Sequence, residues 1–313
     1  MADLISILPQ QLVFGLALGT VYGLIALGYT MVYGVLQMIN FAHGEVFMIG
    51  AYIGWSVFAV LIDWSVGGLP PLWVLPVLLA PAMLLCGGLG MTLERLAYRP
   101  LYMRGATRLG PLISAVGASI FLQNFVMLTM GARMKVYMTN LVFPRTWRFN
   151  ILGVNVSALV IVIVVVSLLL MWGLVALIQR TGLGRAIRAV SEDREMATAL
   201  GIDANRVVGL TFFLGSALAG AAGVLVGLYY TQIDFVMGYS AGLKAFTAAV
   251  LGGIGNIKGA MLGGLLLGVI ESLASTFINP AFKDVVAFAV LILTLVFKPE
   301  GILGEKLADW KKI

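Results

Sequence analysis

Charged residues, cysteine and histidine are all scarce in this chain of 313 residues. Only 11% of the residues are charged and 61% are hydrophobic, whereas soluble domains are about 25% charged and about 45–50% apolar. Such an apolar surplus excludes an ordinary soluble domain, because a water-facing surface cannot accommodate it. The single cysteine, Cys86, lies in an apolar run, so one chain can form neither a disulfide nor a thiolate metal site, and we interpret Cys86 as a packing residue.

Motifs for nucleotide binding and hydrolysis are also absent. The nearest approach to a G-x-x-x-x-G-K-[ST] phosphate loop, residues 252–258, has the wrong spacing. His43 is the only histidine, which excludes an H-E-x-x-H metal site, and no G-x-S-x-G elbow occurs. The formal net charge is +6, but the positive residues fall between apolar segments, which is typical of membrane loops and not of nucleic-acid binding. We therefore predict that the chain is not an enzyme, has no cofactor of its own and does not bind nucleic acid.

Long runs without charge are what the sequence has in abundance. No Asp, Glu, Lys or Arg occurs in residues 4–44, 64–93, 109–132, 158–178 and 209–233. A spanning helix needs about 20 such residues to cross about 30 Å of hydrocarbon. We predict an all-α polytopic membrane protein in which residues 1–313 form one permease domain of about nine crossings (range eight to ten), some of them broken or re-entrant. The expected crossings are 10–36, 45–62, 70–93, 110–130, 157–178, 207–230, 241–256, 259–278 and 284–298.

The distribution of Lys and Arg predicts the orientation. Basic residues gather in 94–108, 179–206 and the tail after 298, whereas 63–69 has none. Basic loops stay in the cytoplasm, so we expect the C-terminus inside and the N-terminus outside. The segment 131–155 carries Arg and Lys residues yet falls outside, and we interpret it as an external loop that faces a partner, with a short hairpin over 136–144. The alternative is a missed span.

The cytoplasmic loop 181–206 has the signals of a docking element. Ser191 can cap a helix, acidic residues favour its first turn, and Gly201 is well placed to end it. The single short helix between them would present an apolar face made by Met196, Ala199 and Leu200, with small residues such as Ala197 and Ala199 allowing close approach of another surface. The alternative is a solvated connector.

Polar residues interrupt the apolar sequence just after the first span. Asn40, His43 and Glu45 are costly at membrane depth and would face a cavity or one another. Gly44 permits a broken helix, which is tolerated where it is buried in protein or lines water. We predict a helix break on the translocation pathway; the alternative is a segment that surfaces at the cytoplasmic interface, with His43 in a structural role.

Two further sites combine polar residues with a span. Lys244 and Glu271 are charges inside spans and either pair with each other or line the pathway. Asn256 belongs to a second interrupted segment, 252–260. Both interrupted segments have Asn, then a titratable residue, then Gly, then Met-[Ile/Leu]-Gly, which indicates a weak internal repeat of the kind transporters show. Chance similarity in glycine-rich sequence is the alternative.

Part of the loop resembles a known signature. Glu195-Met196-Ala197-x-x-x-Gly201 is similar to the E-A-A-x-x-x-G pattern in permease subunits of bacterial ATP-binding-cassette importers. The resemblance implies a coupling helix held in a cleft of the ATP-hydrolysing subunit. Met196 stands where the pattern has Ala, and no Ile-x-Leu-Pro comes after it.

Motifs along the whole chain narrow the resemblance to LivH-type permease subunits of high-affinity branched-chain amino acid transporters. They are Ile39-Asn40-Phe41-Ala42-His43-Gly44-Glu45, Met48-Ile49-Gly50-Ala51-Tyr52, Gly184-Arg185-Ala186-x-Arg188-Ala189-Val190, Ala199-Leu200-Gly201-Ile202, Ala249-Val250-Leu251-Gly252-Gly253-Ile254-Gly255-Asn256 and Phe297-Lys298-Pro299-x-Gly301-Ile302-Leu303-Gly304.

The resemblance implies import of leucine, isoleucine and valine across a bacterial inner membrane. It implies a second related permease subunit, two ATPase subunits that hold ATP and Mg, and a periplasmic or lipid-anchored substrate-binding protein. The coupling residues would be Arg185, Arg188, Glu195, Ala197 and Gly201. Alternatives are another amino acid, urea or a short amide, more distantly a simple sugar. A different class, an ion-coupled transporter or channel, would use Glu45, Lys244, Glu271 and His43 as a relay.

Overall fold

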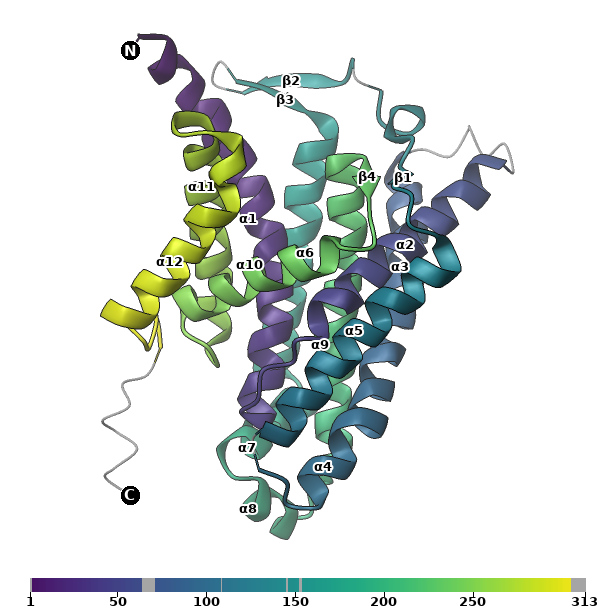
Figure 1. Ribbon diagram of the computed structural model, residues 1–313, viewed down its shortest axis with the longest axis vertical. Helices are drawn as coiled ribbons and strands as arrows, with labels where there is room; N and C mark the ends of the chain where they lie inside the picture. Colours follow the sequence, from purple (N-terminus) through teal and green to yellow (C-terminus); the bar gives the residue numbers. More distant parts are fainter. Residues whose placement is uncertain (1, 64–70, 108, 145, 152–153, 305–313) are drawn as a thin grey trace.

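The computed structural model describes residues 2–63, 71–107, 109–144, 146–151 and 154–304, and it shows a bundle of long helices (Figure 1). The long helices are α1 (Ala2–Leu36), α2 (His43–Asp63), α3 (Pro71–Leu93), α5 (Leu109–Met130), α6 (Ala158–Arg180), α9 (Ala204–Tyr230), α10 (Met237–Gly252), α11 (Ile257–Phe277) and α12 (Lys283–Phe297). Shorter elements are a π turn (Glu94–Tyr98), α4 (Arg99–Met103), α7 (Gly182–Glu192), α8 (Arg194–Ala199), β1 (Lys135–Val136), β2 (Arg148–Ile151), β3 (Val154–Ser157) and β4 (Gln232–Ile233).

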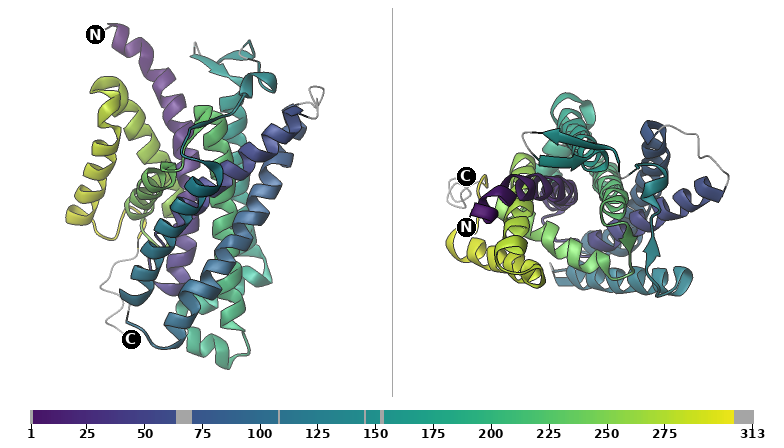
Figure 2. Two further views of the ribbon diagram at one scale, coloured as in Figure 1. Left: turned by 45° about the vertical axis from the view of Figure 1, so that its right-hand side comes forward. Right: turned by 90° about the horizontal axis from the view of Figure 1, so that it is seen from above.

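Eight helices in the described part of the chain are long and apolar enough to cross a membrane. The predicted polytopic all-α class is therefore confirmed, within the expected range. The crossing predicted at 241–256 is not a full span: α10 has 16 residues, about 24 Å at 1.5 Å per residue. It ends where Gly253 takes a φ of +108°, and it lies across the bundle at mid-height, as two views agree (Figures 1 and 2).

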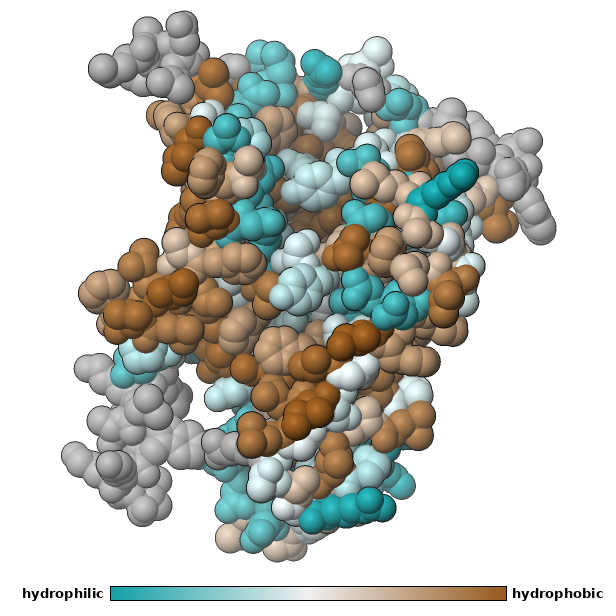
Figure 3. Space-filling view, in the orientation of Figure 1, coloured by the Kyte–Doolittle hydropathy of each residue, from teal (hydrophilic) through white to brown (hydrophobic). Residues whose placement is uncertain are grey.

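The centre of the bundle consists of α1 and α9, and small residues make that possible. The most apolar stretch of α9 has 83% of its residues buried inside the protein, whereas the corresponding stretch of the last span, residues 280–297, has 11% buried. Helices approach closely where they carry glycine: a Cβ on Gly19 of α1 would lie 2.8 Å from the Cα of Leu265 on α11. The outer helices α5 and α12 instead expose apolar side chains, which cover them on the face seen in Figure 3.

Short β structure covers the end of the bundle that holds the N-terminus (Figure 1). β2 and β3 form an antiparallel hairpin, whereas β1 pairs with β4. The hairpin predicted over 136–144 is therefore wrong in position, because the backbone of β1 is taken by β4 and Thr139–Leu141 forms a 3₁₀ turn. The described part of 131–155 contains no span, which removes that alternative.

Tyr137 anchors this covering to the bundle. Its hydroxyl is buried and donates to the carbonyl of Ala51 on α2 at 2.6 Å. Burial raises the pKa of the Tyr137 hydroxyl well above its ordinary value, so it stays a neutral donor. The side chain therefore fixes β1 against α2 by one hydrogen bond and its own packing.

The loop 181–206 lies at the opposite end and contains two helices, α7 and α8, where the sequence predicted one (Figure 1). Asp193, not Ser191, caps the second helix: its backbone is extended and its carboxylate accepts from the Met196 amide at 2.9 Å. Ser191 lies within α7 and donates to the Arg188 carbonyl. Gly201 takes a φ of +86° just after α8, which confirms it as the residue that ends the helix.

Candidate translocation site and coupling loop

The helix break lies between Leu36, where α1 ends, and His43, where α2 begins. The connection climbs from the lower end of α1 to the start of α2 near mid-height of the molecule (Figure 1). Asn40 holds this turn, because its Oδ1 accepts both the Ala42 amide at 3.1 Å and the Tyr98 hydroxyl at 2.7 Å. Asn40 is buried, which favours a helix break inside the protein over a segment that simply surfaces.

The start of α2 is packed directly on α10. A Cβ on Gly44 would collide with the carbonyl oxygen of Gly238, so only glycine fits here. The His43 ring is fully buried and lies edge-on to Tyr29 of α1, with ring centroids 4.7 Å apart. Three helices therefore meet at the first turn of α2.

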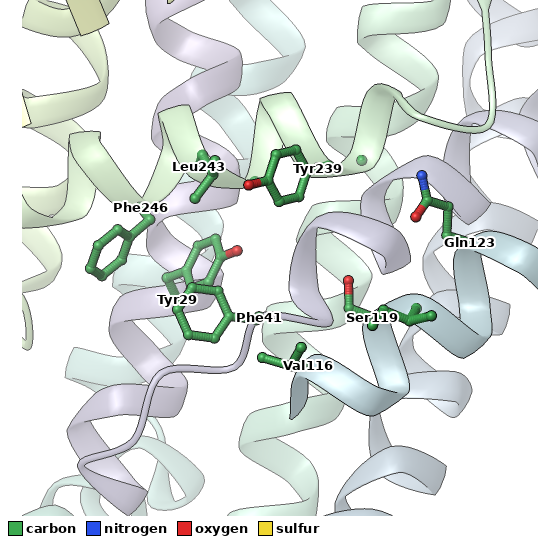
Figure 4. A pocket seen from close by; sticks show the side chains of 11 residues that line it. Tyr29, Phe41, Val116, Ser119, Gln123, Tyr239, Leu243 and Phe246 are labelled. Carbon is green, nitrogen blue, oxygen red and sulfur yellow. The ribbon is translucent and has the colours of Figure 1, made fainter. Parts of the chain in front are cut away.

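A cavity of about 270 Å³ opens beside this turn, between α1, α5 and α10 (Figure 4). Its walls are mainly apolar and aromatic, with a few hydroxyl and amide groups. The side chains labelled in Figure 4 are Tyr29, Phe41, Val116, Ser119, Gln123, Tyr239, Leu243 and Phe246. Concave sites of this make-up suit small organic ligands, and this volume is just below their usual range of about 300–1,000 Å³.

Glu45 lies directly behind the cavity wall. Its carboxylate is 1% exposed and accepts from the Ser119 hydroxyl at 3.3 Å through Oε1. Its Oε2 has no hydrogen-bond partner among the described residues. It faces Gly238, since a Cβ built there would lie 2.5 Å from that oxygen. Ser119 and Gly238 both line the cavity. The Oε2 atom of Glu45 is therefore a buried hydrogen-bond acceptor without a partner among the described residues, and it lies at the edge of the cavity.

Lys244 and Glu271 form a separate cluster between α1, α10, α11 and α12. The Lys244 ammonium is 2.9 Å from Glu271 and 2.7 Å from Asp284. The Tyr22 hydroxyl donates to the other Glu271 oxygen at 2.9 Å. Of the two predicted possibilities the structure shows pairing, which lowers the cost of charge at membrane depth. Neither charge lines the cavity.

Asn256 is part of neither cluster. It caps α11 by accepting the Gly259 amide at 3.0 Å, and its amide donates to the Leu303 carbonyl at 2.8 Å. Of the seven residues predicted for the pathway or its breaks, the structure thus gathers Asn40, His43, Gly44 and Glu45 in the helix break beside the cavity, and none of the four lines its wall.

The loop 181–206, for which a coupling role was predicted, exposes an apolar pair at its tip. Met196 is 58% exposed and Leu200 is 76% exposed, one helical turn apart. Arg185, Arg188 and Glu195 are also exposed, and one Arg188 nitrogen donates to the Ile178 carbonyl at the end of α6. Ala197 is instead buried inside this chain, so its small size serves internal packing and does not admit another surface.

Sequence patterns did not indicate a polar network at the end of α3. Glu94 is fully buried in the π turn and pairs with Arg99 at 2.7 Å, while the Tyr102 hydroxyl donates to it at 2.6 Å. The Arg194 guanidinium lies 4.7 Å from the Tyr102 ring centroid and donates to Asn205 at 2.8 Å. The sequence did contain one signal for this network: Glu94 directly follows an apolar run and precedes several arginines.

A bundle of membrane-length helices, a buried helix break beside a cavity and an exposed loop at one end define a membrane permease. The comparisons make the class specific. The chain belongs to the family of permease components of branched-chain amino acid transport systems, whose profile matches residues 11–295. This membership confirms the expected non-catalytic membrane component, with no cofactor in this chain.

Relatives extend over nearly the whole chain. The high-affinity branched-chain amino acid transport system permease protein BraD of Pseudomonas aeruginosa is 50% identical over 95% of both chains. The permease LivH of Salmonella typhimurium is 48% identical over 95% of both. More distantly, a probable branched-chain amino acid transport permease LivM of Methanocaldococcus jannaschii is 30% identical over 40% of this chain and 41% of its own. No solved structure matches.

Proposed function

We propose that this chain is the translocating subunit of an ATP-driven importer that moves leucine, isoleucine and valine across a bacterial inner membrane. The names of the BraD and LivH relatives, at about half identity, support the substrate class. Residues 1–313 act as one permease domain in this proposal. ATP and Mg are held by partner subunits, because this chain has no phosphate-binding loop.

The observation that carries the proposal is the cavity with the Glu45 carboxylate behind it. Phe41, Leu243 and Phe246 offer apolar surface to an aliphatic side chain. The free Oε2 of Glu45 is an acceptor for the substrate's ammonium group, once Ser119 or the turn beside it moves. An aliphatic amino acid needs both kinds of contact, whereas a simple sugar needs several paired hydroxyl contacts.

Partners can be assigned to the surfaces of this chain. A second, related permease completes the pore opposite the cavity rim, so that Tyr239, which is 64% exposed on that rim, lines the pathway between the two subunits; the partial match to a LivM permease supports such a companion. Of the two ATPase subunits, one docks on the loop 181–206 of this chain through Met196 and Leu200, with Arg185, Arg188 and Glu195 at the rim, and the other docks on the companion permease. A periplasmic or lipid-anchored binding protein delivers substrate at the end that carries β1–β4, and lipid surrounds α5 and α12.

Orientation in the membrane is part of the proposal. The end with α4, α7 and α8 carries the basic loops and faces the cytoplasm in this proposal. The basic tail after residue 298 assigns the C-terminus to the same side. The N-terminal end and the segment 131–155 face outside. The loop 181–206 then meets ATPases where ATP is available, which is the arrangement an ATP-driven importer needs.

Uptake by proteoliposomes tests the proposal. The chain is co-expressed with its genomic companion permease, ATPases and binding protein, and radiolabelled leucine uptake is measured with ATP inside the vesicles or withheld. A Gly201→Pro/Glu195→Arg double variant, which alters the first turn of α8 and the residue that ends it, is expected to abolish ATP-dependent uptake while the complex still assembles.

Gly255→Pro is the control, because Gly255 also has a positive φ and open space around it but lies outside the loop 181–206. Uptake that ignored ATP and depended on a proton or sodium gradient would overturn the proposal. It would assign transport to the Lys244–Glu271–Asp284 cluster instead.

A further inference from the structure

Direct contacts lead from the coupling loop into the bundle. Arg194, the first residue of α8, lies over the Tyr102 ring, a cation–π arrangement. The Tyr102 hydroxyl donates to Glu94 at 2.6 Å, and Arg99 holds both oxygens of the same carboxylate. A displacement of α8 therefore reaches the buried Glu94 carboxylate through one aromatic ring.

The π turn carries Glu94 at its first position and Tyr98 at its last. Both side chains are fully buried. The Tyr98 hydroxyl donates to Asn40 Oδ1 at 2.7 Å, and that oxygen also accepts the Ala42 amide in the break before α2. One five-residue turn thus connects the network under α8 to the turn that sets the start of α2.

A π turn is a local irregularity within an otherwise α-helical run. It holds one residue more per turn than an α-helix, occurs mostly as isolated turns and is frequent at functional sites. Relaxing it to α geometry would rotate α4 by about 100° relative to α3, since one residue occupies that angle in an α-helix. Such a change would move Tyr98 and Arg99 together.

We propose that the π turn Glu94–Tyr98 transmits movement of the coupling loop to the helix break. Arg194 and Tyr102 bias the turn from the cytoplasmic end, and Tyr98 shifts Asn40 and with it the first turn of α2 beside the cavity. Tyr98, Tyr102 and Glu94 are positioning residues, since none of them lines the cavity. The inference rests on the proposed importer function and adds the route by which ATPase movement reaches the substrate.

The test is the number of leucine molecules imported per ATP hydrolysed by the complete complex in proteoliposomes. Tyr98→Phe removes only the hydroxyl that reaches Asn40, and Tyr102→Phe removes only the one that reaches Glu94. Each is expected to lower the ratio about fivefold, the effect of one hydrogen bond on a two-state equilibrium. Basal ATP hydrolysis and co-purification of the subunits are expected to stay at the wild-type level.

Tyr137→Phe is the matched control, because Tyr137 is another buried tyrosine with one hydrogen bond to α2, but at the opposite end. Its ratio should equal the wild type. In the Tyr98→Phe/Tyr102→Phe double variant the ratio should fall no further than in the lower single variant, since both hydroxyls act along one route.

Two results would overturn the inference: a wild-type ratio in both single variants, or effects that multiply in the double variant as independent sites do. If the complex with Tyr98→Phe fails to assemble, Tyr102→Phe alone tests the inference, because the Tyr102 side chain is only partly buried and its loss of a hydroxyl should be tolerated. Absence of ATP-dependent leucine uptake in the wild type would instead refute the proposed function, so the two failures are distinguishable.

Discussion

Two helix breaks in this protein begin with the same order of residues and end in different environments. In each, an asparagine precedes a titratable residue, a glycine and a Met-x-Gly segment. In each, the glycine packs on α10: a Cβ on Gly44 would collide with the Gly238 carbonyl, and one on Gly259 with that of Gly252. The two ends of α10 therefore receive the starts of α2 and α11 in the same way.

The neighbours make the difference. At the first break Asn40 is buried, and Tyr98 and Ser119 bring hydroxyls to Asn40 and Glu45 from the π turn after α3 and from α5. At the second, Asn256 is exposed to solvent on one side, caps its helix and ties down the backbone of Leu303. The shared local pattern determines where a helix starts. Side chains from helices elsewhere in the sequence determine whether that helix start becomes part of the candidate translocation site or only a capped helix end.

Removing the two asparagines should separate the breaks most strongly. Asn40→Ala strands the Tyr98 hydroxyl and the Ala42 amide in a buried place, at about 1–3 kcal/mol for each unpaired group. Asn256→Ala loses a helix cap worth about 1 kcal/mol. We expect the apparent melting temperature of the purified complex to fall clearly further for Asn40→Ala. Equal shifts in the two variants would contradict the comparison.

A methyl group at the glycines should show what the breaks share. Gly44→Ala and Gly259→Ala both press a Cβ against a backbone carbonyl of α10, and overpacking of this kind costs about 1–3 kcal/mol. Gly34→Ala, with open space around it, should be neutral or stabilising because alanine favours helix. Thermal unfolding of the three variants checks this, and a Gly44→Ala protein as stable as Gly34→Ala would refute the packing.

A charged residue beside the glycine of each break, Glu45 in the first and Lys258 in the second, should differ in its effect on transport. Glu45→Gln keeps the shape of the side chain but removes the charge available to a substrate ammonium group, so leucine uptake should fall about tenfold, as for one charge-assisted hydrogen bond. Lys258→Gln changes a residue outside the cavity and should leave uptake at the wild-type level. Initial rates in proteoliposomes, normalised to assembled complex, provide the comparison. Equal rates for the two variants would remove Glu45 from the pathway.

Periodicity and charge predicted most of the fold, because an apolar run of membrane length has few other uses. The helices α5, α6, α9 and α11 lie within a few residues of the expected crossings, and α1 ends where its crossing was expected to end. The error at α10 has a simple cause: glycine also occurs inside α10, so the glycines at 253 and 255 did not mark a turn, and hydropathy did not reveal the one at Gly253.

The site was predictable only in part. Asn40, His43 and Glu45 stood out because polar residues are rare inside spans. Their partners did not: Tyr98 lies 58 positions from Asn40 and Ser119 lies 74 from Glu45, and no local spacing relates such pairs. Likewise, serine and aspartate have similar preferences for the N-cap position, so the sequence did not distinguish Ser191 from Asp193. The structure shows that Asp193 caps α8, because its backbone is extended there.

Protection of a thiol at the cavity tests the central claim most directly. Cys86 is the only cysteine and is fully buried, so Tyr239→Cys places one reactive thiol at the rim of the cavity. We predict that leucine, delivered by the binding protein to the assembled complex, slows maleimide labelling of Tyr239→Cys. We predict no such slowing for Tyr239→Cys/Glu45→Gln, or for Trp172→Cys on the exposed face of α6. Labelling that leucine leaves unchanged in a transporting complex would contradict the assignment of this cavity to the substrate.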